Sequence, residues 1–455
     1  MKKQVQSQHR SRTSGDGRNN PLTPALAVRL AVVTLLDGVL RERRQLSELL
    51  AEGTMLGPLS GPDRARAQRL TNETLRNLDR ADFVLSRFID RLPPAPGLLV
   101  LRLATVELCA LGEAAHGVVD SAVTLMRKDR RSAKMAGLAN AVLRKVASEG
   151  PALWATLPPP QLPSWLRRRL IHIYDEAIVQ AMETAHLSPA PTDLTVRDSS
   201  QTQAWAVTLG AEHLPTGSLR LPASGQLTDL PGYAEGAWWV QDAAAAIPVR
   251  ALAPQKGEQI LDLCAAPGGK SMQLAASGAK VTALDSSATR MARVQENLAR
   301  TGLHAHCVVA DALTWSNART FDAVLLDAPC SATGTVRRHP DLPHVKGGKG
   351  LHDVFELQSR MIDAALSFLK PGGRLTYCTC SLLTEEGELQ AKTAIERHGL
   401  LDETPAPEDL GLPTTSRVPT GGLRLRPDFW PERGGMDGFF VAVLRKSENG
   451  GPNTG

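Results

Sequence analysis

The sequence predicts three folded units in series: an all-helical bundle, a small α+β unit and a doubly wound α/β domain. A chain of 455 residues exceeds the roughly 100–200 residues of one average domain. Apolar residues follow a helical period up to about residue 148. After about residue 245, short apolar runs alternate with helical stretches. The second pattern is typical of a parallel sheet built from βα units.

The composition and the first residues favour a globular protein of the cytoplasm. Hydrophobic residues make up 42% of the chain and charged residues 22%. No apolar run approaches the ~20 residues that a membrane-spanning helix needs. Residues 1–12 are polar and lack the apolar segment of a secretory signal. We therefore expect a cytoplasmic monomer without a membrane span.

The cysteines are too few and too unevenly spaced for a disulfide framework, so we expect free thiols. No Cys-x-x-Cys pair exists to bind zinc, and no metal site is predicted. The six are Cys109, Cys264, Cys307, Cys330, Cys378 and Cys380.

Charge is distributed unevenly along the chain. The formal net charge is +5, but residues 1–150 contain 24 Lys and Arg against 15 Asp and Glu. A basic amino-terminal third joined to a mildly acidic remainder indicates one part that meets a polyanion and another that carries chemistry. Solvated helix faces would give the same imbalance, so that interpretation stays open.

The amino-terminal third is expected to be helical over residues 21–148, after a polar, disordered tail at residues 1–20. Thr23 followed by Pro24 predicts the start of the first helix, because Thr caps helices and Pro suits their first turn. No segment here has the alternation of a strand. Further helices are predicted at 99–111, 118–126 and 135–146.

Residues 149–245 are expected to form a linker helix and the small α+β unit. Prolines from 158 to 163 break the pattern, and one helix is predicted over 165–182. The unit itself combines strands at 194–197 and 218–221 with a helix at 202–209. The α/β domain then covers residues 246–446, and residues 447–455 form a second disordered tail. Its strands are predicted at 259–264, 281–285, 306–310, 323–327, 374–378 and 438–444.

Polar and thiol side chains stand where these strands end. Ligands of open α/β sheets bind beyond the carboxyl ends of the strands, near the point where strand order reverses. We therefore expect one shared edge to carry Cys264, Asp285, Asp311, Asp327 and the segment 378–381.

The turn after the first of these strands is rich in glycine and is predicted to bind a cofactor. Glycine lets the backbone approach a ligand, and the start of the next helix offers free N–H groups to a carboxylate or phosphate. A P-loop would need glycine at Cys264, and the Gly-x-Gly-x-x-Gly of dinucleotide sites is absent. The alternative, that this turn is only a tight connection between a strand and a helix, stays open. The predicted contacts are Cys264, Ala265, Ala266, Pro267, Gly268, Gly269 and Lys270.

Two aspartates complete a predicted adenosine pocket. Asp285 ends the second strand, near the spacing at which an acidic residue binds a ribose hydroxyl pair. Asp311 follows the third strand and could accept a hydrogen bond from an adenine amino group. Alternatively, each aspartate simply caps the following helix.

Cys330 and Cys380 are the candidate reactive thiols, whereas Cys378 is expected to pack. The C5 atom of cytosine is a poor nucleophile, but attack of a thiolate on C6 makes C5 able to accept a methyl group. Covalent catalysis of this kind splits one hard step into easier ones. S-adenosylmethionine fits both the adenosine pocket and the glycine turn, and Asp327 could hydrogen-bond the base.

Four segments resemble one known family. They are Leu261-Asp-Leu-Cys-Ala-Ala-Pro-Gly-Gly-Lys270, Asp327-Ala-Pro-Cys-Ser-Ala-Thr-Gly334, Arg337-Arg-His-Pro-Asp341 and Thr379-Cys-Ser381. Together they are similar to the RNA (cytosine-5) methyltransferases, which include bacterial small-subunit ribosomal RNA methylases and the eukaryotic Nop2/Sun proteins. The resemblance implies a Rossmann-like, S-adenosylmethionine-dependent domain. It also implies that Cys380 attacks the base, that Cys330 assists release, and that residues 264–270, Asp285, Asp311 and Asp327 contact the cofactor.

The helical third resembles the RNA-binding fold of NusB, through residues 63–70 and 138–144. A NusB-like domain before this catalytic domain is the arrangement of the RsmB-type 16S rRNA methylases. The middle unit would then be an RNA-recognition-like subdomain and the partner 16S rRNA, with the particular cytosine left open. Residues 342–349 depart from the family pattern, so no role is assigned to that loop.

Three rival interpretations remain. DNA cytosine-5 methylases use the cysteine of a Pro-Cys segment, which would make Cys330 the nucleophile. The chain could instead be a non-catalytic RNA-binding factor in transcription or ribosome assembly. A nicotinamide-dependent oxidoreductase is disfavoured, because the phosphate fingerprint is missing and paired thiols would have no use.

Overall fold

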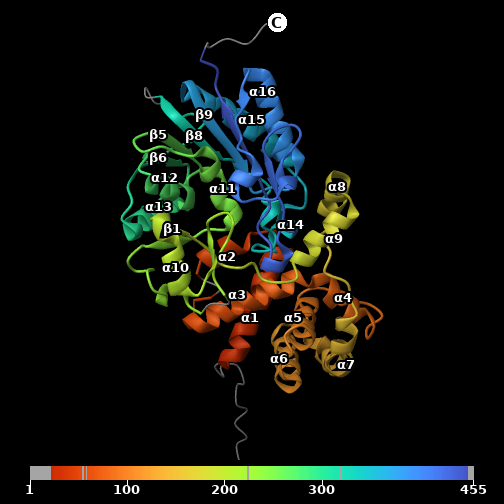
Figure 1. Ribbon diagram of the computed structural model, residues 1–455. Helices are drawn as coiled ribbons and strands as arrows, with labels where there is room; N and C mark the ends of the chain where they lie inside the picture. The colour runs from red at the N-terminus through yellow and green to blue at the C-terminus, as the bar shows by residue number, and fades with distance from the viewer. Residues whose placement is uncertain (1–21, 54–55, 58, 223–224, 317–319, 449–455) are drawn as a thin grey trace, which may run out of the picture.

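The computed structural model describes residues 22–53, 56–57, 59–222, 225–316 and 320–448. Figure 1 shows a helical domain at the foot, a twisted sheet flanked by helices at the top, and a smaller antiparallel unit beside them. All three predicted units are therefore present.

The amino-terminal domain is helical, as the apolar period predicts. The side chain of Thr23 accepts a hydrogen bond from the backbone N–H of Leu26, and Pro24 lies in the first turn. Leucine and valine side chains from all the longer helices form one buried core. The helices are α1 (Pro24–Leu40), α2 (Leu46–Ala51), α3 (Gly61–Arg76), α4 (Leu78–Ser86), α5 (Gly97–Cys109), α6 (Ala115–Lys128) and α7 (Ala136–Ala155).

The linker differs from the sequence prediction. Residues 165–182 were predicted as one helix, but the structure has α8 (Ser164–Tyr174) and α9 (Glu176–Ala185). Asp175 separates them with φ of 74°, and its side chain accepts from the N–H of Ile178 to cap α9. A local left-handed residue ended the helix where the apolar period continued. Helix α7 likewise runs past residue 148, across the predicted boundary.

The small unit is a four-stranded antiparallel sheet of order β2-β3-β1-β4 with one helix. The helix α10 (Thr202–Leu209) has the predicted bounds, and two strands lie where they were expected. The other two were missed, because such short strands are defined by pairing rather than by local pattern. The strands are β1 (Asp193–Val196), β2 (Glu212–His213), β3 (Leu219–Arg220) and β4 (Trp238–Val240).

The larger sheet has the order β10-β12-β9-β8-β5-β6-β7, with β11 paired to β12. Strands β5 to β9 are parallel, and β12 runs antiparallel beside β9. All six predicted strands are found. They are β5 (Gln259–Leu263), β6 (Lys280–Asp285), β7 (Ala305–Val309), β8 (Phe321–Asp327), β9 (Leu369–Thr379) and β12 (Phe439–Arg445), joined by β10 (Leu401–Asp402) and β11 (Leu423–Leu425).

Helices cover both faces of this sheet, which confirms the doubly wound fold. Leu261 and Val324 face a core shared with α15 and α16, whereas Ile260 and Ala323 face α11 and α12. The chain moves from β5 outward to β7 and then returns to β8 on the other side of β5, so strand order reverses between β5 and β8. The helices are α11 (Ala243–Leu252), α12 (Gly269–Ala276), α13 (Ala288–Thr301), α14 (Leu342–Lys346), α15 (Leu351–Ser367) and α16 (Glu388–His398).

Helix α11 spans the predicted boundary at residues 245 and 246, so that boundary falls inside a helix. The predicted tail at residues 1–20 and most of the tail at 447–455 lie outside the described residues. Among the helices that are described, none combines the length and apolar character needed to cross a bilayer.

Candidate active site

The glycine-rich turn connects β5 to α12 through two left-handed residues. Cys264 has φ of 61°, a strained conformation for a residue with a side chain. Gly268 has φ of 104°, and a Cβ there would lie 3.2 Å from Val294 Cγ1. Position 268 therefore requires glycine, and the turn brings the N-terminus of α12 to the carboxyl edge of the sheet.

Asp285 and Asp311 lie beside this turn and also stabilise local turns. Asp285 accepts hydrogen bonds from the N–H groups of Ala266 (3.3 Å) and Ser287 (2.9 Å), and it pairs with Arg290 at 2.9 Å. Asp311 accepts from a backbone N–H of the turn that follows β7. These bonds hold local turns. The rival interpretation, that each aspartate caps the following helix, is not met: Ser287 is the N-cap of α13, and a turn rather than a helix follows Asp311 in the described residues.

One cavity of about 420 Å³ brings the strand ends together. It lies at the switch point between β5 and β8, where open α/β sheets bind ligands. The rest of the glycine turn, from Pro267 to Lys270, together with Ala265 and Cys378, does not line it. The predicted residues that do are Cys264, Ala266, Asp285, Asp311, Asp327, Cys330 and Cys380.

Asp327 is held by two neighbours beneath the cavity. Its Oδ2 accepts from Lys270 Nζ at 2.7 Å, and its Oδ1 lies 3.5 Å from the Cys378 sulfur. Burial alone would lower the pKa of Lys270, but the carboxylate of Asp327 raises it above its usual value. Lys270 is therefore a cation that keeps a carboxylate in place, and Cys378 is fully buried, as the packing interpretation predicts.

The two candidate thiols meet in this cavity. The sulfur atoms of Cys330 and Cys380 lie 3.4 Å apart, within reach of an S–H···S hydrogen bond. That hydrogen bond, then burial and the charge of Asp327, raise the pKa of Cys380 well above its usual value. Strand β9 ends at Thr379, so Cys380 lies in the following loop rather than on the strand face shared with Cys378.

A buried carboxylate that the sequence reasoning missed joins the two cysteine segments. Glu386 Oε1 accepts from the N–H of Ser331 at 2.7 Å and from Gln358 Nε2 at 3.2 Å. Its Oε2 accepts from the hydroxyls of Ser331 and Ser381, the residues that directly follow the two cysteines. The only local signal was a serine after each cysteine and an acidic pair shortly beyond the second.

The segment at residues 342–349, to which no role was assigned, contains α14. Lys346 Nζ donates to the backbone carbonyl of Cys330 at 2.7 Å. Asp341 accepts from the first N–H of α2 at 2.9 Å, and Trp165 of α8 donates to a carbonyl of α14 at 2.9 Å. Figure 1 shows α14 between the helical domain and the sheet. This helix connects both to the loop that carries Cys330, one of the two candidate thiols.

The arginines of the Arg337-Arg-His-Pro-Asp341 segment hold the units together. Arg337 donates to the carbonyl of Ser188 at 3.0 Å. Arg338 pairs with Asp437 at 2.9 Å and with Asp242. Both arginines are thereby engaged in packing between the middle unit and the catalytic domain.

Comparisons with known proteins agree with this architecture. A sequence model described as 16S rRNA methyltransferase RsmB/F matches residues 249–445, and one for the NusB family matches residues 26–148. Ribosomal RNA small subunit methyltransferase B of Erwinia tasmaniensis is 32% identical over 444 residues, which cover 92% of this chain and 98% of that protein. The protein of the same name from Escherichia coli O6:H1 is 33% identical, over 90% of this chain and 96% of that protein. The crystal structure of PH0851 matches the fold with a TM-score of 0.68 at 21% identity, and the match covers 94% of this chain and 100% of that chain.

Proposed function

Because the chain belongs to the RsmB/F family of S-adenosylmethionine-dependent rRNA methyltransferases, we propose that it methylates C5 of one cytosine in 16S rRNA. We propose further that the reaction proceeds through a covalent bond between Cys380 and C6 of that cytosine. The observation that carries the proposal is the pair of thiols 3.4 Å apart at the switch-point cavity.

The residues around the cavity fit the cofactor. Asp285 lines the cavity and offers a carboxylate to a ribose hydroxyl pair. Leu313 and Met361 line the cavity and give an adenine ring apolar contact. When bound, S-adenosylmethionine supplies the electrophilic methyl group. Asp311 is assigned to the adenine side of the pocket.

Cys380 is assigned the nucleophilic role. Its thiolate bonds to C6 of the base, and the electron pair of the 5,6 double bond moves to make C5 nucleophilic. In the free enzyme the hydrogen bond with Cys330 and burial hold Cys380 as a thiol, so Cys380 must lose its proton before its sulfur attacks. Asp327 is assigned to the base itself, because a carboxylate fixed by Lys270 can accept from the cytosine amino group.

Cys330 is assigned to the second half of the reaction. After methylation, removal of the C5 proton restores the 5,6 double bond and expels the Cys380 thiolate. The Cys330 sulfur lies next to the Cys380 sulfur, which must leave C6, so Cys330 is the group placed to promote release.

The test is to follow the adduct in single-cysteine variants. With cofactor and 16S rRNA, Cys330→Ala should accumulate a protein–RNA complex that survives denaturing electrophoresis, because release is blocked. Cys380→Ala should form no adduct and no 5-methylcytosine, and Cys307→Ala, which changes a thiol outside the cavity, should behave as wild type.

Other outcomes would contradict the assignment in defined ways. An adduct in Cys380→Ala but not in Cys330→Ala would make Cys330 the nucleophile. A ligand that binds only the folded state raises the melting temperature of a protein. If saturating S-adenosylmethionine failed to raise it, the result would favour a non-catalytic RNA-binding factor. Bisulfite sequencing of 16S rRNA with and without the gene tests the substrate.

A further inference from the structure

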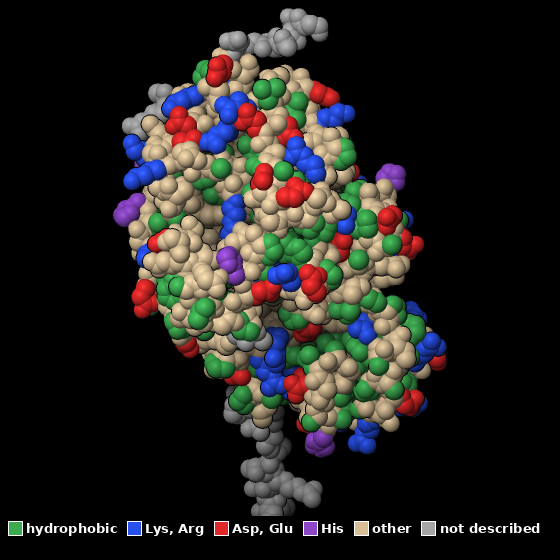
Figure 2. Space-filling view, in the orientation of Figure 1, with side chains coloured by type: hydrophobic (Ala, Val, Ile, Leu, Met, Phe, Trp, Pro, Cys, Tyr) green, Lys and Arg blue, Asp and Glu red, His purple; other side chains and the backbone are tan. Residues whose placement is uncertain are grey.

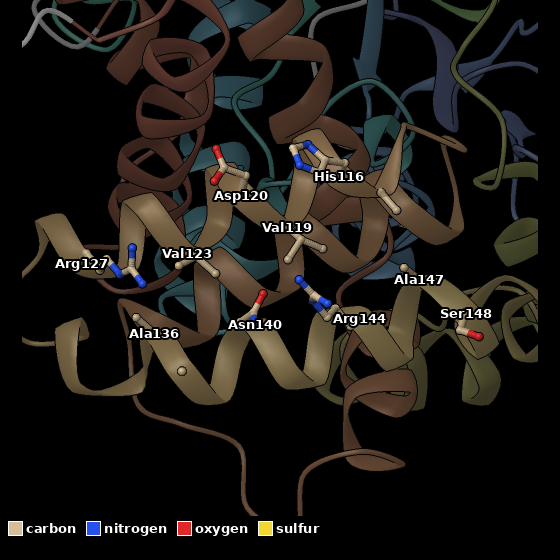
Figure 3. A pocket seen from close by; sticks show the side chains of 12 residues that line it. His116, Val119, Asp120, Val123, Arg127, Ala136, Asn140, Arg144, Ala147 and Ser148 are labelled. Atoms are coloured by element: carbon tan, nitrogen blue, oxygen red, sulfur yellow. The ribbon is translucent and has the colours of Figure 1, made fainter.

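A second cavity, of about 720 Å³, lies in the helical domain between α6 and α7. Figure 3 shows Arg144 and Asn140 extending from α7 toward α6, with Val119 and Val123 facing them across the groove. The floor is apolar, because both valines are at least nine-tenths buried. Arg127, at the end of α6, lines the same groove.

The two arginines of this α6–α7 groove are unpaired. Neither Arg127 nor Arg144 has an ion pair or side-chain hydrogen bond within the part of the chain that the structure describes. The two groove arginines differ in this from Arg29 and Arg102 of the same domain: Arg29 binds Glu107 at 2.7 Å and Arg102 binds Asp82 at 2.6 Å. Free cations above an apolar floor leave positive charge available for an external anion.

The surrounding residues strengthen this field. Residues 115–148 contain seven Lys and Arg against two Asp and Glu. One of the two acids, Asp129, is already paired with Arg131 at 2.8 Å. The other, Asp120, lines the groove from α6 and offsets part of the charge of the two arginines. Figure 2 shows cations and anions intermixed over the face it presents, so net charge alone does not locate such a site.

We propose that the α6–α7 groove binds a single-stranded segment of the RNA substrate, away from the target cytosine. Arg127 and Arg144 would contact its phosphates, and the apolar floor would receive the face of a base or ribose. The proposal deepens the proposed function and rests on RNA being the substrate, but not on the chemistry at C5. The cavity volume lies within the ~300–1,000 Å³ of small-ligand sites, which suits a nucleotide.

A single strand fits better than a duplex or a protein. Helices α6 and α7 pack directly against each other, so the groove between them admits one strand rather than two. Single strands also expose unstacked bases, which guanidinium planes can stack upon. An acidic protein segment would find the same arginines but no aromatic side chain to anchor it, whereas a base can stack on a guanidinium plane.

The sequence singles out the same place independently. Asn140 and Arg144 belong to the segment 138–144 that carries the resemblance to NusB, and the catalytic site uses neither. They stand four residues apart and so share one face of α7, whereas Val142 and Leu143 are buried in the core. The segment therefore serves packing on one side and is open to a ligand on the other.

The test measures binding of the full chain to a single-stranded RNA of about twelve nucleotides without cytosine, by fluorescence anisotropy over a range of salt. The variant is Arg127→Ala with Arg144→Ala. We expect about tenfold weaker binding or more, and a slope of log K against log salt reduced by about 1.4, since each single-strand phosphate contact contributes about 0.7. Melting temperatures establish that the variants fold.

Lys128→Ala with Lys145→Ala is the matched control, because it removes the same charge from the same helices outside the groove. The control should bind RNA nearly as wild type. If the two variants lost equal RNA affinity, the effect would come from diffuse positive charge and the proposal would be overturned. Unchanged RNA affinity in both variants would overturn it as well. A glutamate-rich peptide that binds wild type but not the arginine variant, with RNA binding unchanged, would make the groove a protein site. Failure of the C5 assignment would show in the adduct assay and leave this measurement unaffected.

Discussion

The carboxyl edge of the sheet and the α6–α7 groove hold polar side chains in opposite ways. At the sheet edge, Glu386 is fully buried and accepts hydrogen bonds from both cysteine segments. In the groove, Arg127 and Arg144 are exposed and have no partner among the described residues. Bond formation requires reacting atoms to be held in place, whereas attraction to phosphate tolerates movement. Substitutions should therefore have abrupt effects at the edge and graded effects in the groove.

The largest effect is expected from Glu386→Ala. The substitution removes the acceptor shared by Ser331 and Ser381, so the loops of Cys330 and Cys380 lose their common support. A misplacement of about 1 Å can cost roughly a hundredfold in rate, and we expect kcat to fall by about that factor. The KM for S-adenosylmethionine should change little, because Glu386 does not line the cavity.

Glu386→Gln separates positioning from folding. Glutamine keeps the length of the side chain and an acceptor for the N–H of Ser331, so it should recover most of the activity. If Glu386→Ala retained wild-type kcat, or lost activity only through a raised KM, the positioning role would be refuted. Melting temperatures of both variants check that each is folded.

The second prediction concerns the reactivity of Cys380 with pH. Its pKa lies well above the usual value, because the Cys330 hydrogen bond, burial and Asp327 all favour the thiol. The thiolate fraction at neutral pH is therefore small and rises with pH. Alkylation of Cys380 by iodoacetamide, followed by peptide mass spectrometry, should accelerate about tenfold per pH unit between about pH 7 and pH 9.

Cys330→Ala should sharpen this result in a specific direction. The variant removes the largest cause of the raised pKa, so Cys380 should react faster at neutral pH than in wild type. A slower reaction would mean that Cys330 activates Cys380 in the free enzyme rather than holding it as a thiol.

A third prediction tests α14, which lies between the helical domain and the loop of Cys330. Lys346→Met removes the ammonium that donates to the carbonyl of Cys330, while keeping the aliphatic stem. A hydrogen bond from a charged group contributes about 1.5–3 kcal/mol, so we expect the release step to slow by about tenfold. The adduct should then accumulate partially during turnover. Lys349→Met, an exposed neighbour on the same segment, should have no effect; equal slowing in both variants would contradict the role of Lys346.

Much of the fold could be predicted because local patterns in the sequence determine where its helices and strands begin and end. Apolar runs placed all six predicted strands of the catalytic sheet, and Thr23 and Pro24 placed the start of α1. The break at Asp175 was missed, because one left-handed residue overrode an unbroken apolar period. Strand β4 was missed because three residues become a strand only by pairing with β1.

The site was predictable to the extent that its residues follow strand ends. Cys264, Asp285 and Asp327 converge as the topology of a parallel sheet requires. Glu386 and Lys346 could not be found in this way, because their roles depend on partners distant in sequence. The hydrogen bonds from Ser331 to Glu386 and from Lys346 to the carbonyl of Cys330 exist only once the loops are folded.

The smallest expected effect is on stability, at Asp262 beneath the glycine turn. Asp262 is fully buried, its Oδ2 accepts from Ser271 Oγ at 2.5 Å, and burial raises its pKa to about 7. A carboxyl whose folded pKa is raised favours the folded state when protonated, and that contribution is lost as pH rises through about 7. Asp262→Asn stays neutral at every pH, so the melting temperature of the variant relative to wild type should increase by about 2 °C from pH 5 to pH 8. Asp409→Asn, at an exposed position of the same domain, is the control for the same change of side chain away from the buried edge. If the melting temperature of the Asp262 variant relative to wild type did not change with pH, burial would not hold Asp262 in its protonated form, and the contrast between a rigid sheet edge and a solvated groove would lose its electrostatic basis.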